Sequence, residues 1–147
     1  MKAFRFLVLL PILLILTACP DSLYSFTFTN NSTSEVFMYL NLDYLENTLY
    51  PDTSIARVRT GYHFEQGKSY NYDYSYEYLF KRNDTVSMFI FDADTINLYS
   101  WEEIQSGYKI LQRYDISAEN FKALKYTITY PPTEAMKDVK MYPPYGQ

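Results

Sequence analysis

The chain of 147 residues has little of what most enzyme active sites are built from. It contains one cysteine, one histidine and four glycines. No Gly-x-Ser-x-Gly elbow or glycine-rich oxyanion loop accompanies His63, and a lone histidine between two aromatic residues is more often structural than catalytic. The sequence therefore predicts a protein that is not an enzyme, with no catalytic residue, no cofactor and no metal site.

Basic residues are in the minority, with 13 lysines and arginines against 17 aspartates and glutamates. Two of the basic residues, Lys2 and Arg5, precede Cys19, and no acidic residue does. From Cys19 onward the net charge is therefore −6, from 11 basic and 17 acidic residues. Because phosphate binding requires a basic surface, this acidity argues against nucleic acid as a partner and against attraction to anionic lipid headgroups.

The N-terminus combines the positive charges of Lys2 and Arg5 with an apolar run over residues 6–16. The run is about half as long as the roughly 20 residues that span a bilayer, which indicates a cleaved secretory signal over residues 1–18. It ends in Leu16-Thr17-Ala18-Cys19, which resembles the lipobox of bacterial lipoproteins. That resemblance implies a diacylglycerol on the sulfur of Cys19, cleavage before this residue, and a further acyl chain on the new amino group.

Lipidation of Cys19 would determine where the protein is located and which chemical groups it has available. Several acyl chains anchor a protein firmly, at about 0.8 kcal/mol per buried methylene group. The modification would also consume the only thiol, so no disulfide, metal ligand or nucleophile would remain. We expect a membrane-anchored lipoprotein of the bacterial envelope, in the outer membrane, with residues 19–22 as its tether. The alternative is a secreted protein with a free cysteine, and the sequence leaves open which side of the membrane the domain faces.

Aromatic residues are abundant, with 17 tyrosines and 10 phenylalanines, and these residue types favour half-buried sheets. Strand patterns occur over residues 23–29, 35–42, 55–59, 85–91, 108–116 and 125–130. A turn over residues 30–33 predicts that the first two strands form a hairpin. The nearly continuous apolar run over residues 85–91 predicts a strand that is buried on both faces.

Two short helices are expected in the C-terminal half. Ser100 and Glu103 match a capping box, so a helix is predicted over residues 101–106, ending at Gly107. Ser117 is expected to cap a second helix, over residues 118–124.

The chain therefore predicts one mainly β domain over residues 23–130, a compact antiparallel β-sandwich-like fold with two short helices. A tail rich in proline and tyrosine follows over residues 131–147, with a helical turn at 134–138. An α+β sheet with helices on one face is the alternative fold.

One segment is unusual because tyrosine occupies every second position, at Tyr70, Tyr72, Tyr74, Tyr76 and Tyr78. A strand would place all five rings on one face, whereas the helical spacing over residues 74–81 favours an extended start and then a helical turn. Rings on one face can stack on a sugar or on the side chains of a partner, so these five are the candidate ligand-stacking residues. The alternative is that half of the rings belong to the core.

Several acidic residues follow the predicted strand over residues 85–91. Asp92 and Asp94 could share a cation with Glu102 or Glu103, or form a glycosidase pair. However, Asp-x-Asp lacks the third ligand and the glycine of a calcium loop. We therefore expect these aspartates to end a strand and to cap the next turn.

Four stretches resemble small lipoproteins of Bacteroidetes to which no activity is assigned. They are residues 84–92 (DTVSMFIFD), 99–104 (YSWEEI), 109–117 (KILQRYDIS) and 128–132 (ITYPP). The resemblance covers roughly residues 16–147, and it implies an envelope location but no catalytic residue. Three triplets of an aspartate, a serine or threonine, and an aliphatic residue also resemble the O-glycosylation motif of this group. They begin at Asp21, Asp84 and Asp94, and the resemblance implies that Ser22, Thr85 and Thr95 accept a glycan. The alternative for these triplets is ordinary turn and cap chemistry.

For function, we expect a non-catalytic envelope lipoprotein that binds a glycan or a protein partner through exposed tyrosines. An envelope hydrolase acting on polysaccharide or peptidoglycan is one alternative, and a structural accessory subunit of an envelope complex is another. A cleft with converging carboxylates or His63 would favour the hydrolase. A flat, exposed tyrosine surface would favour binding, and a large apolar patch would favour the subunit.

Overall fold

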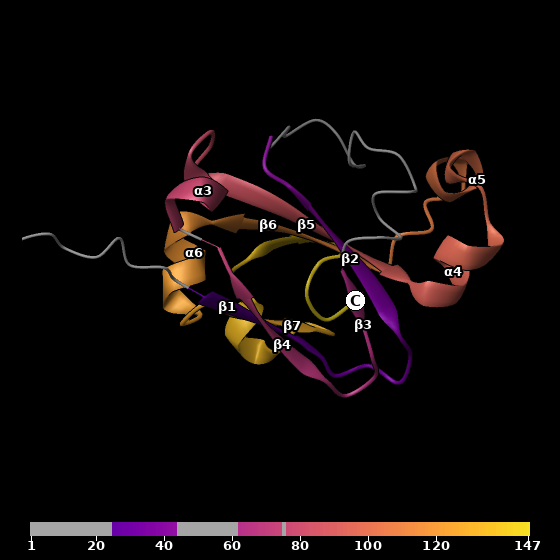
Figure 1. Cartoon of the computed structure of the whole chain (residues 1–147), viewed down its shortest axis with the longest axis horizontal. Coiled ribbons are helices and arrows are strands. Elements are labelled where there is room, and N and C mark those ends of the chain that lie inside the picture. The colour runs from indigo at the N-terminus through magenta and orange to yellow at the C-terminus, as the bar shows by residue number, and fades with distance from the viewer. Residues whose placement is uncertain (1–24, 44–61, 75) are drawn as a thin grey trace, which may run out of the picture.

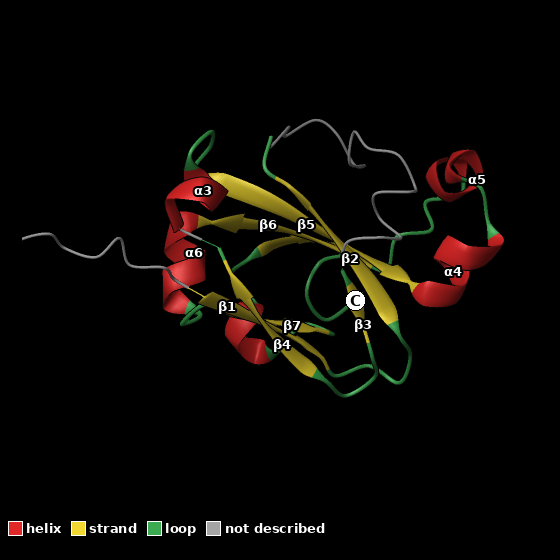
Figure 2. Ribbon diagram, viewed as in Figure 1, coloured by secondary structure: helices red, strands yellow, loops and turns green. Residues whose placement is uncertain are grey.

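The computed structural model describes residues 25–43, 62–74 and 76–147, and it arranges their strands in two layers (Figure 1; Figure 2). The predictions for the signal, for Cys19 and Ser22, and for a strand over residues 55–59 lie outside the described residues. In the described part, no helix is long and apolar enough to cross a membrane.

Eight strands lie within the described ranges. They are β1 (Ser25–Asn30), β2 (Val36–Asn41), β3 (His63–Phe64), β4 (Ser69–Asp73), β5 (Thr85–Asp92), β6 (Gln112–Ser117), β7 (Thr127–Tyr130) and β8 (Lys140–Tyr142). One sheet has three strands in the order β4-β1-β7, and the other has five in the order β3-β2-β5-β6-β8. All pairs are antiparallel except β1 with β7, which is parallel. The predicted mainly β, sandwich-like fold is confirmed, and its short helices make it an α+β variant of a sandwich.

The predicted hairpin between the first two strands is wrong, because β1 and β2 belong to different sheets. The side chain of Asn30, which is fully buried, fixes the crossing between the layers. Its Nδ2 donates to the carbonyl of Ser34 at 2.8 Å and to those of Phe64 and Glu65 at 3.2 Å. The polar residues at 30–33 therefore turn the chain from one layer into the other rather than back onto its own strand.

The main core fills the space between the two sheets. Phe26 and Phe28 of β1 point into it from the smaller sheet and are almost fully buried. Phe28 lies against Phe64 of the larger sheet, with ring centroids 4.4 Å apart. Met88 and Tyr114 meet them from the centre of the larger sheet, so one apolar cluster joins both layers.

A second apolar cluster lies on the opposite face of the five-stranded sheet. Phe89 and Phe91 of β5 are fully buried there, and Ile96 and Ile104 cover them from two helices. Strand β5 is therefore buried on both faces, as its apolar run predicts.

Short helices occupy the two ends of the sandwich. They are α3 (Tyr76–Phe80), α4 (Ala93–Leu98), α5 (Trp101–Ser106), α6 (Ala118–Ala123) and the 3₁₀ turn η2 (Glu134–Met136). Helices α3 and α6 lie at one end, and α4 and α5 lie at the other (Figure 1). Both predicted caps are confirmed: Ser100 and Glu103 form a capping box on α5, and Ser117 caps α6.

The predicted boundary at residue 130 is too early, because the segment called a tail belongs to the domain. Strand β8 pairs with β6 at the edge of the larger sheet. Met136, Val139 and Met141 are buried in the main core. The helical turn predicted at 134–138 is present as η2.

Candidate functional site

The tyrosine-rich segment adopts the mixed structure that its spacing favours. It begins as β4, which ends at Asp73, and it continues as α3 from Tyr76. Tyr70 and Tyr72 point from β4 toward the main core, where they meet Phe64 with ring centroids 5.2 and 5.8 Å apart. These two rings are therefore packing residues of the sandwich.

Tyr74 continues this inward packing. Its ring stacks beside Phe26 at 6.1 Å, and its hydroxyl forms a short hydrogen bond with the hydroxyl of Tyr62. Burial raises the pKa of Tyr72 to about 12, and the neighbouring phenols of Tyr62 and Tyr70 add to the shift. Burial also raises the pKa of Tyr74, together with its hydrogen bond to Tyr62. Both phenols stay neutral at physiological pH, so they provide neither a base nor a nucleophile.

The last two rings of the segment lie further out. Tyr78 stacks on Tyr74 with centroids 5.8 Å apart and keeps 55% of its surface exposed. Tyr76 is half-buried against Phe80, and the ammonium group of Lys122 lies 4.8 Å from its ring centre. The structure thus brings the five tyrosines close together, but it turns three of them inward. A flat stacking surface made of all five rings does not form.

His63 lies on β3, at the edge of the larger sheet. Its Nε2 is 2.9 Å from a carboxylate oxygen of Glu35, and both side chains are about half exposed. Its ring packs beside Phe37 at 5.0 Å. Within the described ranges, no hydroxyl hydrogen-bonds to the ring, so the geometry is that of a surface histidine–carboxylate contact rather than a triad.

The acidic residues after β5 have the structural roles that the sequence suggests. Asp92 caps α4, because its Oδ1 accepts from the backbone N–H groups of Asp94 and Thr95. Glu103 accepts from the backbone N–H and the hydroxyl of Ser100, and these bonds lower the pKa of its carboxyl group. In the part of the chain that the structure covers, no three histidine, cysteine or acidic side chains gather as a metal site would require.

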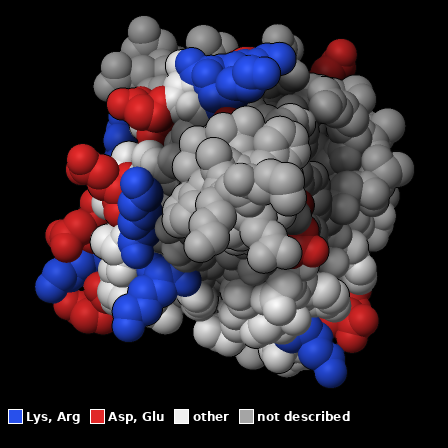
Figure 3. Space-filling view, turned by 60° about the vertical axis from the view of Figure 1, so that its left-hand side comes forward, with Lys and Arg blue, Asp and Glu red and all other residues white. Residues whose placement is uncertain are grey.

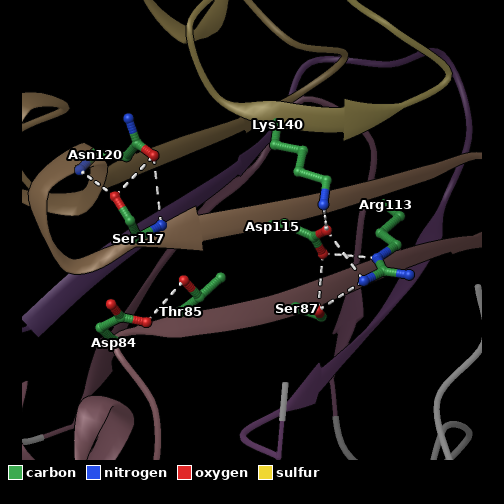
Figure 4. Close-up of polar contacts among 8 residues, drawn as sticks. All are labelled: Asp84, Thr85, Ser87, Arg113, Asp115, Ser117, Asn120 and Lys140. Carbon is green, nitrogen blue, oxygen red and sulfur yellow. Dashed lines mark hydrogen bonds and ion pairs between the residues drawn. The ribbon is translucent and has the colours of Figure 1, made fainter. Parts of the chain in front are cut away.

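The Asp-Thr pairs also serve local structure. The carbonyl of Asp84 accepts from the backbone N–H of Ala118, and its carboxylate lies 3.3 Å from the hydroxyl of Thr85 (Figure 4). Thr85 and Thr95 are both partly exposed, at the start of β5 and in the first turn of α4. Cap and turn chemistry therefore accounts for both pairs, and their use as acceptor sites remains a prediction.

A buried charge cluster that was not predicted from the sequence lies on the outer face of the larger sheet (Figure 4). Arg113 and Asp115 are 1% and 3% exposed and alternate along β6, so both point to this face. The guanidinium group donates from Nε and Nη2 to the two carboxylate oxygens, at 2.6 and 3.0 Å. Ser87 of β5 donates to the same carboxylate at 2.8 Å, and Lys140 of β8 lies 3.9 Å from it.

This cluster joins three adjacent strands through one carboxylate. Asp115 is directly opposite Ser87 on one side and Lys140 on the other. The arrangement fixes strand register, since a shift of one residue would place Arg113 and Asp115 on the core side. We therefore assign it a structural role. The sequence signal was the Arg-x-Asp spacing inside a strand, which placed both charges on one face.

The described surface also contains a cleft of about 420 Å³ between α6, β7 and the segment over residues 133–139. Its polar lining residues are Asn120, Lys125, Thr127, Thr129, Thr133 and Asp138. Its apolar lining residues are Ala123, Leu124, Ala135, Met136 and Val139. The volume lies within the range of about 300–1,000 Å³ that small-molecule sites occupy. The sequence did not indicate this cleft, because its lining residues, all within residues 120–139, belong to successive elements whose packing against one another no local pattern predicts.

The lining hydroxyl and amide groups are already oriented by the fold. Asn120 uses its Oδ1 to accept from the hydroxyl and the backbone N–H of Ser117 in the cap of α6. The hydroxyl of Thr129 lies 3.3 Å from the sulfur of Met136, which is a weak acceptor. Thr127 donates to the carbonyl of Lys125 at 3.4 Å. The lining of the cleft therefore combines hydroxyl and amide groups with apolar side chains.

The fold and the site together define a small α+β sandwich domain with a surface cleft that polar and apolar side chains line. Comparison of the chain with protein-family models, with curated proteins and with solved structures finds no match.

Proposed function

We propose that the protein is a non-catalytic, lipid-anchored binding domain of the bacterial envelope, held in the outer membrane by acylated Cys19. The support for the anchor is in the sequence, where a charged and then apolar N-terminus ends in Leu16-Thr17-Ala18-Cys19. Only residues 20–24 separate this cysteine from the first strand, so the domain lies close to the lipid.

We propose further that its ligand site is the cleft between α6 and β7 and that its ligand is a neutral glycan. The observation that carries this proposal is the lining of the cleft, which combines three threonine hydroxyls and the amide of Asn120 with apolar side chains, and in which one lysine and one aspartate balance each other in charge. Sugar hydroxyl groups both donate and accept hydrogen bonds, as threonine and asparagine side chains do. The apolar lining residues Leu124, Met136 and Val139 offer a surface for the C–H faces of a sugar ring.

Hydrolysis of the glycan has less support than binding. A glycosidase of the usual kind needs two carboxyl groups about 5–9.5 Å apart across the bond. Among the described residues that line the cleft, Asp138 is the one carboxylate. His63 is not among them, since it lies on β3 and pairs with Glu35. Binding through the tyrosine segment also loses support, because only Tyr78 of its five rings is largely exposed.

The glycan proposal is tested with the mature chain carrying Cys19→Ser, so that it stays soluble. Envelope glycans are screened on an array, and chemical shifts of the backbone amides then map the binding surface. We expect shifts at Thr127, Thr129 and Thr133. If no glycan binds, or if shifts occur only outside the cleft, the proposal is wrong.

A bulky substitution gives a second readout. Ala135 is exposed at the cleft, so Ala135→Trp should fill it and weaken binding at least tenfold, which is about 1.4 kcal/mol. Leu98→Trp is the matched control, because Leu98 is 76% exposed on α4 at the other end of the domain. Equal affinities for the two variants would exclude the cleft as the binding site.

A further inference from the structure

The first strand starts very near the predicted lipid anchor, which restricts the orientation of the domain on a membrane. Ser25 follows Cys19 by six residues, so a fully extended chain between them spans at most about 20 Å. Ser25 is paired with Asp73 at the end of β4, and α3 begins three residues later. Phe26 contacts Phe121 of α6, with centroids 5.6 Å apart. The anchor is therefore joined to the end of the sandwich that carries α3 and α6 (Figure 1).

We name this region the α3/α6 end and define it as residues 76–84 and 118–126. It has four basic residues, Lys81, Arg82, Lys122 and Lys125, against three acidic ones. Arg82 forms an ion pair with Asp43 of the neighbouring chain segment, which brings the region close to neutrality. Figure 3 turns this side of the molecule forward and shows basic side chains interspersed with acidic ones.

The opposite end is more acidic. Lys109 lies at this end, with its ammonium group 4.2 Å from the ring centre of Tyr99. Residues 92–107, which contain α4 and α5, add four acidic side chains and no basic one, so the net charge is −3. These four are Asp92, Asp94, Glu102 and Glu103. An anionic membrane surface repels this end, and the repulsion falls off within a Debye length of about 8–10 Å. The charge distribution therefore favours the same orientation as the tether.

The side chains at the α3/α6 end are also suited to the headgroup region. Tyr78 is 55% exposed, and tyrosine is enriched at membrane interfaces because its ring is apolar and its hydroxyl polar. The ammonium group of Lys122 lies over the ring of Tyr76, so its methylene stem covers an aromatic surface.

From the tether length, the charge asymmetry and these side chains, we infer that the α3/α6 end rests on the bilayer, with Tyr78 and Lys122 at headgroup level. The acidic α4/α5 end then points away from the membrane. This inference rests on the proposed acylation of Cys19, and it names the lipid surface as the partner of the α3/α6 end.

The test uses the lipidated full-length mature protein in vesicles of phosphatidylethanolamine and phosphatidylglycerol. Because acylation occupies the sulfur of Cys19, a cysteine introduced elsewhere is the only free thiol and can carry a nitroxide spin label. Tyr78→Cys reports on the α3/α6 end, and Leu98→Cys on α4 is the matched control, since both positions are exposed. Collision rates are measured with a water-soluble nickel chelate and with oxygen, which concentrates in lipid.

We expect the label at position 78 to collide with the nickel chelate several-fold less often than the label at position 98, and with oxygen more often. The difference should disappear when the vesicles are dissolved in detergent. Equal nickel accessibility at both positions on vesicles, or greater protection at position 98, would overturn the inferred orientation.

Flotation of the same samples separates this inference from the proposed anchor. If the protein floats with the vesicles but both labels are equally exposed to water, the orientation is wrong and the anchor stands. If the mature protein isolated from host membranes does not float, the anchor itself is refuted. Circular dichroism checks that Tyr78→Cys is folded. A label at position 81 in the Tyr78→Phe variant is a second reporter of the α3/α6 end.

Discussion

Removal of the carboxylate of Asp115 should destabilise the domain more than removal of any exposed charge. Asp115 is 3% exposed and accepts three hydrogen bonds, two from Arg113 and one from Ser87. In Asp115→Ala the guanidinium group stays buried without its counter-ion, and breaking a buried ion pair in this way costs about 3–5 kcal/mol. Since whole domains are stable by about 5–15 kcal/mol, the loss is a large fraction of the total.

The assay is equilibrium unfolding of the soluble mature chain in urea, followed by circular dichroism. Asp84→Ala is the matched control, because Asp84 is an exposed carboxylate at the start of β5, for which a change within about 0.5 kcal/mol is expected. The double variant Arg113→Met/Asp115→Leu should recover much of the lost stability, since it leaves no charge buried. If Asp115→Ala costs no more than Asp84→Ala, the assigned structural role of the charge cluster is wrong.

Three further predictions concern the caps, the phenols and the C-terminal segment. Glu103 has a lowered pKa in the folded state, so its ionised carboxylate stabilises α5 fully at pH values above the ordinary pKa of a glutamate. The wild type should therefore be more stable than Glu103→Gln at neutral pH, and this difference should disappear as the pH falls through the lowered pKa. Urea unfolding at several pH values measures the difference. Tyr72 and Tyr74 have raised pKa values, so their contribution to stability is fully present below the ordinary phenol value near 10 and is lost as the pH rises through the raised values, which is about 12 for Tyr72. Absorbance at alkaline pH should show part of the tyrosines ionising only as the domain unfolds. Deletion of residues 133–147 should unfold the domain, because it removes β8 and three buried side chains, Met136, Val139 and Met141. The burial of each side chain stabilises the fold by about 1.5–3 kcal/mol. Circular dichroism of the shortened chain should show no cooperative unfolding transition.

Each of these has an outcome that contradicts it. A pH-independent difference between wild type and Glu103→Gln would show that the cap does not favour the ionised carboxylate. Ionisation of all tyrosines near pH 10 without loss of structure would contradict the burial of the phenols. A cooperative unfolding transition in the chain that ends at residue 132 would restore the predicted boundary at residue 130.

Local sequence signals predicted several elements of this fold. The capping box at Ser100 and the cap at Ser117 depend on side chains within three residues of each other, so the local pattern indicated both helix starts, while the bonds between Ser117 and Asn120 were not predicted. The burial of β5 on both faces follows from an apolar run that leaves no polar side for solvent. The change from strand to helix in the tyrosine segment was visible in its two overlapping spacings.

Pairing between distant segments could not be predicted in the same way. The turn after β1 has the composition of a hairpin turn, but the buried side chain of Asn30 bonds to carbonyls of residues 64 and 65, more than thirty positions away. The segment after Tyr130 is rich in proline, which conceals that Met136 and Met141 complete the core. The bond between Ser87 and Asp115 likewise depends on which strands are neighbours.

The central claim is that Cys19 anchors this domain to the envelope membrane, and the mass of the N-terminal peptide tests it most directly. The protein is isolated from membranes of its host, digested, and analysed by mass spectrometry. We predict a peptide that begins at Cys19 and carries a diacylglyceryl group, with a further acyl chain on its amino group. An N-terminal peptide with an unmodified thiol at Cys19, or one that retains residues 1–18, would contradict the claim.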